Sequence, residues 1–132
     1  MSASVNRILR TLQKVLASRP DLLLPKWRKE CEGDPCPLAG HCALGAEAIY
    51  WLLGYSKAGW KQYHMRWEGF PHWFVRNVKT YEVVDPTREQ YSIVPDYSQG
   101  KGGWINRGGR GPSARAREVI LEVRRRVGVY NV

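Results

Sequence analysis

Three residues of the types that make up a nucleophile, a base and an orienting acid follow one another along the chain: Cys42, His72 and Asp85. A cysteine attacks as its thiolate, and the first turn of a helix favours that anion through its dipole and its unpaired N–H groups. A histidine can take the thiol proton, and a carboxylate can hold the imidazole in one tautomer. The three residues therefore predict a catalytic triad.

The sequence around Cys42 predicts a loop that leads directly into a buried helix. Residues 30–41 are rich in proline and glycine, and from Cys42 onward apolar residues occupy almost all sides of a helix until Gly54. At the start of this helix the backbone N–H of Cys42 is placed to donate to an oxyanion, with His41 as a second donor.

A hairpin is predicted downstream, because β-rich runs at 72–78 and 81–84 are broken near Lys79 and an alternating segment at 63–67 precedes them. In an antiparallel hairpin the start of one strand lies beside the end of the next. His72 and Asp85 are therefore expected to be neighbours. Each residue also has a structural alternative, since Cys42 can be a small core side chain and Asp85 a turn residue.

Two amphipathic helices are expected to flank this unit. Apolar residues recur at helical spacing in 5–16, and Ser113 is a suitable cap for a closing helix whose buried stripe includes Val119 and Val123. Between sheet and closing helix, residues 96–112 contain six glycines. This segment is expected to be a mobile lid, with Trp104 as its apolar anchor. We expect a single α+β domain over residues 1–132.

Gly-His-Cys-Ala at 40–43, His-Trp-Phe at 72–74, Asp-Pro-Thr at 85–87 and Gln-Tyr at 90–91 resemble motifs of the YunG-like family of uncharacterised bacterial and phage proteins. The similarity runs from Trp27 to Tyr91, and the family pattern has glutamine where this chain has His41. The resemblance implies that the residues around the triad support the site: Gly40, His41, Trp73, Thr87 and Gln90.

The order Cys, His, Asp is also distantly similar to the transglutaminase-like branch of the papain-like superfamily. That similarity implies a buried, cysteine-bearing helix packed on a small antiparallel sheet. It also implies hydrolysis or transfer of acyl groups at amides.

Composition limits the function classes. The 132 residues include 21 Lys and Arg against 12 Asp and Glu, a formal net charge of +9. No apolar run reaches the roughly 20 residues of a membrane span, and no signal-peptide pattern precedes the first helix. We expect a cytoplasmic protein without a membrane partner, in the host cytoplasm if phage-encoded, with Cys31, Cys36 and Cys42 reduced.

These features predict a cysteine-dependent hydrolase, deamidase or acyltransferase that acts on a protein, peptide or small amide without a cofactor. Two alternatives stay open. The first is a non-catalytic basic module, which binds an acidic host protein or nucleic acid through seven arginines between residues 107 and 126. The second is a small zinc protein that uses Cys31, Cys36 and Cys42, although adjacent His41 and Cys42 suit one ion poorly.

Overall fold

The computed structural model describes residues 2–34, 36 and 38–128, which form four α-helices, short 3-10 turns and one four-stranded antiparallel sheet. The expected α+β class is therefore confirmed. The helices are α1 (Ala3–Ala17), α2 (Pro25–Glu30), α3 (Cys42–Leu52) and α4 (Ala114–Val127). The strands are β1 (Trp60–Trp67), β2 (Phe70–Asn77), β3 (Val83–Val84) and β4 (Lys101–Gly102). Among the helices of this described part, none is long and apolar enough to cross a membrane.

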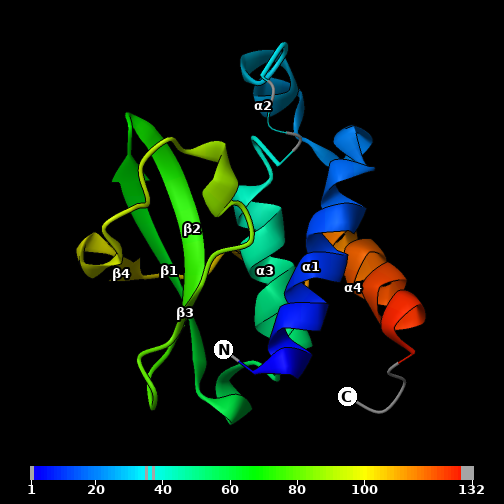
Figure 1. Cartoon of the computed structure of the whole chain (residues 1–132), viewed down its shortest axis with the longest axis vertical. Coiled ribbons are helices and arrows are strands. Elements are labelled where there is room, and N and C mark those ends of the chain that lie inside the picture. The colour runs from blue at the N-terminus through cyan, green and yellow to red at the C-terminus, as the bar shows by residue number, and fades with distance from the viewer. Residues whose placement is uncertain (1, 35, 37, 129–132) are drawn as a thin grey trace.

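Helix α3 is the central layer of the fold. It lies between the sheet on one side and the α1–α4 pair on the other (Figure 1). A helix that is covered on both sides must be apolar around most of its circumference. The sequence meets this requirement, because apolar residues occupy most positions from Leu44 to Leu52, and most of these residues are buried.

The flanking helices were predicted from their apolar spacing, and both are confirmed. In α1 the Ser2 side chain caps the first turn, accepting from the N–H of Val5 at 3.2 Å. In α4 Ser113 plays the same part for the N–H of Ala116, and Gly128 ends the helix at φ +70°. Each helix turns its apolar stripe toward α3 and keeps its charged side chains outside.

The sheet has the order β3-β2-β1-β4. A two-residue turn joins β1 to β2, and both of its residues, Glu68 and Gly69, have positive φ, as such hairpins require. The predicted hairpin between β2 and β3 is present, with Val75 opposite Val84. Alternation along β2 puts Val75 in the core beside α3, and His72 and Phe74 on the other face.

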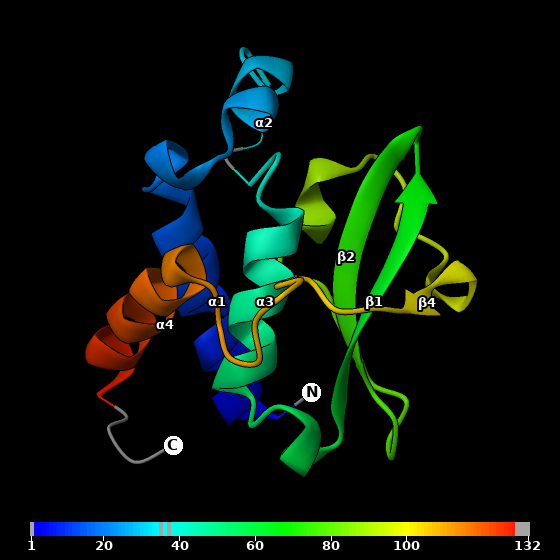
Figure 2. The same ribbon diagram turned by 180° about the vertical axis from the view of Figure 1, so that it is seen from behind.

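The segment 96–112 differs from the mobile lid that its glycines predict. It contains a 3-10 turn, Tyr97–Gln99, and strand β4, which pairs with β1. From β4 the chain crosses α3 and enters α4, as Figure 2 shows from behind. Pairing and packing order this segment, since Gly103 N–H donates to the Gln62 carbonyl at 3.0 Å.

Candidate active site

Cys42 is the first residue of α3, as the loop-to-helix pattern predicts. The first helical hydrogen bond of α3 runs from the N–H of Gly45 to the carbonyl of His41 at 2.7 Å. The half-buried Cys42 Sγ lies 3.7 Å from the carbonyl oxygen of Pro71, directly before His72. The start of α3 therefore meets the start of β2.

The loop before Cys42 depends on glycine at position 40. Gly40 has φ +83°, and a Cβ there would lie 2.9 Å from Leu23 Cδ2 and 3.0 Å from Cys31 Sγ. Its N–H donates to Gln90 Oε1 at 3.4 Å, and Gln90 Nε2 donates to Thr87 Oγ1 at 2.9 Å. The structure thus joins Gly40, Thr87 and Gln90 in one chain of hydrogen bonds beside Cys42.

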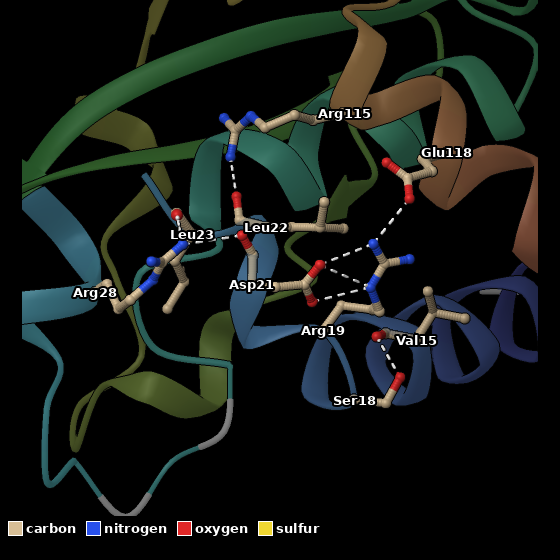
Figure 3. Close-up of polar contacts among 9 residues, drawn as sticks. All are labelled: Val15, Ser18, Arg19, Asp21, Leu22, Leu23, Arg28, Arg115 and Glu118. Atoms are coloured by element: carbon tan, nitrogen blue, oxygen red, sulfur yellow. Dashed lines mark hydrogen bonds and ion pairs between the residues drawn. The ribbon is translucent and has the colours of Figure 1, made fainter. Parts of the chain in front are cut away.

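A polar network fixes the segment that packs against this loop (Figure 3). Arg19 pairs with Asp21 at 2.9 Å and with Glu118 of α4 at 2.8 Å. Arg115, also on α4, donates to the carbonyl of Leu22. These contacts hold the turn after α1 against α4. Leu23, which follows this turn, packs beside Gly40, so the turn also limits the position of the loop before α3.

His72 and Asp85 are in direct contact, which confirms that they are neighbours across the hairpin. His72 Nε2 lies 2.6 Å from Asp85 Oδ2, and the side chains are 0% and 2% exposed. Burial opposes the charged imidazolium, but the hydrogen bond with Asp85 and the influence of the nearby Cys42 and Asp85 side chains outweigh it and raise the pKa of His72 to about 9. One buried imidazole is therefore coupled to both the thiol and the carboxylate.

The two ring nitrogens of His72 have different surroundings. Nε2 is occupied by Asp85, whereas Nδ1 is buried and has no hydrogen-bond partner among the described residues. Since Cys42 also acts on this imidazole, Nδ1 is the nitrogen left to exchange a proton with the sulfur. The ring is held from the side by Tyr91, whose ring meets it edge-on at 4.9 Å between centroids.

Asp85 has two further partners. Tyr97 Oη donates to Oδ2 at 2.8 Å, and the N–H of Thr87 donates to Oδ1 at 3.3 Å. Burial and the negative charge of Asp85 raise the pKa of Tyr97, which therefore remains a protonated donor. Asp85 therefore contacts both the ring of His72, as the triad interpretation expects, and the N–H of Thr87, as the turn interpretation expects.

His41 is not where an oxyanion donor would be needed. Its ring is 1% exposed, and burial together with the charge of Arg115 on α4 lowers its pKa to about 4. Its backbone N–H already donates to the carbonyl of Leu38 at 3.2 Å. The structure therefore does not bring His41 to the pocket beside Cys42, because the ring of this residue is buried in the protein.

Two tryptophans assigned to the site also lie elsewhere. Alternation along β2 puts Trp73 on the face opposite His72, where its ring lies 5.2 Å from that of His64. Trp104 contacts Tyr50 at 5.6 Å and Trp51 at 6.1 Å between ring centroids, near the end of α3 remote from Cys42. Trp104 is thus a packing residue and does not cover the candidate nucleophile.

A pocket of about 200 Å³ opens beside Cys42. Four parts of the chain form it: α2 with the loop after it, the start of α3, the turn between β1 and β2 with the first residues of β2, and the segment after β3. Its aromatic lining consists of Trp27, Phe70 and Tyr91. A substrate group that enters it would reach the Cys42 sulfur.

The described residues offer no metal site. No three or more of their His, Cys, Asp and Glu side chains are grouped so as to hold an ion. The three cysteines are free thiols, and Cys31 shares the pocket with Cys42. The zinc alternative on Cys31, Cys36 and Cys42 is therefore not supported.

Sequence reasoning missed Tyr97 and the carboxylates of the pocket. Tyr97 occurs in a segment without periodicity, so no local signal connects it with Asp85. Glu30 and Glu68 come from α2 and from a turn of the sheet, and only the tertiary fold brings them together.

Comparison with known protein families, with curated proteins and with solved structures finds no match to this chain. The resemblance to the YunG-like family therefore stays a prediction, and the case for function rests on geometry.

Proposed function

We propose that this protein is a cysteine-dependent enzyme that acts on an amide or acyl bond, with Cys42 as nucleophile, His72 as base and Asp85 as the orienting acid. The observation that carries the proposal is the buried 2.6 Å contact between His72 Nε2 and Asp85 Oδ2, on an imidazole that also interacts with Cys42. The proposal includes a papain-like or transglutaminase-like version of the α+β fold and membership of the YunG-like family.

In the proposed reaction, His72 Nδ1 takes the thiol proton and the Cys42 sulfur attacks the acyl carbon. The tetrahedral intermediate collapses to a thioester as the imidazolium gives its proton to the departing amine. Water then attacks the thioester, with His72 again taking a proton. This step releases a carboxylic acid and restores the thiol. A substrate amine in place of water would give acyl transfer.

Two donors serve the oxyanion in this scheme. The N–H of Cys42 belongs to the first turn of α3, where backbone N–H groups have no partner within the helix. Gln90 lines the same pocket, and its Nε2 carries one hydrogen beyond the one donated to Thr87. Gln90 thereby takes the role that the sequence assigned to His41.

The basic binding module remains an untested alternative, and the structure gives it little specific support. Four of the seven arginines make hydrogen bonds within the protein: Arg115 and Arg117 to backbone carbonyls, and Arg125 and Arg126 to Glu122. These contacts fix the four side chains, while Arg125 and Arg126 stay 69% and 40% exposed.

Reaction with p-nitrophenyl acetate tests the proposal without a known substrate. The Cys42 sulfur should displace p-nitrophenolate and gain one acetyl group, which mass spectrometry of proteolytic peptides assigns to a single cysteine. We expect a burst of about one p-nitrophenolate per chain, with Cys42 acetylated well before Cys31 and Cys36. Cys42→Ala should abolish the burst, and His72→Gln should slow it by about 100-fold or more.

Equal acetylation of the three cysteines in the folded wild-type protein would contradict the proposal, and this readout needs no variant. A His72→Gln protein with a native circular dichroism spectrum and an unchanged burst would contradict it too. Cys31→Ser is the matched control, since it removes a thiol from the same pocket and should leave the burst intact.

A further inference from the structure

The pocket beside Cys42 has an acidic wall in a strongly basic protein. Three carboxylates line it, namely Glu30, Asp34 and Glu68, and no lysine or arginine does so among the described residues. The whole chain carries a formal net charge of +9. The sign of the charge around the candidate nucleophile is therefore opposite to that of the protein as a whole.

The ion pairs in the described part of the chain do not involve these carboxylates. Asp34 accepts from the N–H of Cys36 at 2.9 Å, and Glu68 accepts from the Ser92 hydroxyl at 3.1 Å. In both cases the donor is a neutral group and not a cation.

The negative charges act inside the pocket. Burial raises the pKa of the Cys31 thiol, and the charges of Asp34, Cys42 and Glu30 raise it further. Tyr91 also lines this pocket, and burial together with negative charges that include those of Cys42 and Glu68 raises its pKa. Negative charge around the pocket thus disfavours the anionic forms of both Cys31 and Tyr91.

The remaining lining suits a cation as well. The aromatic rings of Trp27, Phe70 and Tyr91 line the pocket together with the carboxylates. Aromatic faces attract ammonium and guanidinium groups. The ring of Trp27 already has such a neighbour, because Lys26 Nζ lies 5.0 Å from its centroid.

We infer that this pocket binds a positively charged group, an ammonium or guanidinium that the substrate carries beside the acyl carbon attacked by Cys42. The inference rests on the proposed function and adds the charge class of the substrate. Carboxylates position the cation, and the aromatic rings pack on the alkyl chain that bears it. A substrate with a carboxylate at this place would be repelled.

Charged thiol reagents of similar size test the inference. Cys42 is treated with three methanethiosulfonates that carry a trimethylammonium, a sulfonate or no charge. In each reaction the thiolate attacks the sulfenyl sulfur, a mixed disulfide forms and methanesulfinate leaves. Peptide mapping gives the rate at Cys42, and the cation-to-anion rate ratio is divided by the same ratio for the protein unfolded in urea.

The normalised ratio should exceed about 10 at low ionic strength and fall toward 1 in about 1 M salt. A unit charge roughly 8 Å from the sulfur in water changes such a ratio by about fivefold. Glu30→Gln, Asp34→Asn and Glu68→Gln should each lower it by about that factor. Glu32→Gln is the matched control: like the three test residues Glu32 is exposed, but it does not line the pocket, so its loss should leave the ratio nearly unchanged.

A wild-type ratio at or below 1 would overturn the inference, because the net charge of the protein would then decide the preference. A ratio that falls equally in Glu32→Gln and in the three pocket variants would overturn it as well. The proposed function is judged separately, from the neutral reagent and His72→Gln. If His72→Gln leaves the neutral rate unchanged, the proposed function fails, whereas the charge ratio still reports on the pocket.

Discussion

Replacing Asp85 by asparagine removes the charge beside His72 and preserves the size of the side chain, so the geometry gives a definite expectation. Asp85 Oδ2 accepts from both His72 and Tyr97, and Oδ1 accepts from the N–H of Thr87. Asparagine has one oxygen. If that oxygen remains on Thr87, the amide nitrogen faces His72 Nε2 and donates to it. The imidazole proton then resides on Nδ1, the nitrogen that must accept the proton of Cys42.

The size of the effect follows from the pKa of His72, which the folded protein raises from 6.5 to about 9. This difference corresponds to about 3 kcal/mol of preference for the imidazolium, which Asp85 and Cys42 share. If Asp85 supplies half or more, Asp85→Asn should slow the reaction of Cys42 with iodoacetamide near pH 7 by about 10- to 100-fold.

The same substitution predicts a pH dependence of stability. Because the pKa of His72 is raised in the folded state, the stabilisation is fully present below about pH 6.5 and is lost as the pH rises through about 9. The difference in unfolding free energy between wild type and Asp85→Asn should therefore be largest near pH 6. It should shrink by about 2 kcal/mol or more toward pH 9.5, where the turn contact with Thr87 remains and the lost acceptor of Tyr97 still lowers stability. Urea unfolding at both pH values measures it.

Asp96→Asn is the matched control, since Asp96 caps a 3-10 turn by accepting from the N–H of Ser98 and makes no contact with His72. It should leave the alkylation rate unchanged. If Asp85→Asn also leaves the rate unchanged, and lowers stability equally at both pH values, Asp85 is a turn residue and the triad is refuted.

Two further substitutions test the supports of the site. Gly40→Ala should lower the unfolding free energy by about 2–4 kcal/mol, because it adds a clash with Leu23 to the left-handed strain, whereas Gly33→Ala, at the same φ of +83° in open space, should cost only about 1 kcal/mol. Equal losses in urea unfolding would show that the contact with Leu23 is unimportant. Tyr97→Phe should cost about 1–3 kcal/mol but slow alkylation of Cys42 less than tenfold, because Asp85 still holds the imidazole. A loss as large as that in Asp85→Asn would assign the orienting role to Tyr97.

The predictable part of the fold and site is the part encoded by local periodicity. The apolar run after Cys42 defines a buried helix, and the hairpin rule alone brings His72 beside Asp85. Local periodicity does not determine which way a single side chain at a helix start points. For His41 this direction depends on packing in the tertiary structure, where the ring is buried near Arg115 of α4. The glycines around Trp104 predicted a mobile lid, which is also not observed. Pairing of β4 with β1 and the contact of Trp104 with Tyr50 of α3 order that segment.

Two thiols share the pocket, and their environments explain why only one of them should be a nucleophile. Cys31 lies at the far end of α2, where burial and the charges of Asp34, Cys42 and Glu30 raise its pKa and keep it protonated near neutral pH. Cys42 has what Cys31 lacks, because it begins an eleven-residue helix and is coupled to the buried imidazole of His72. The acidic wall that would select a cationic substrate thus also suppresses the neighbouring thiolate. A reagent that enters this pocket should therefore distinguish the two sulfurs by their chemistry, since both are within its reach.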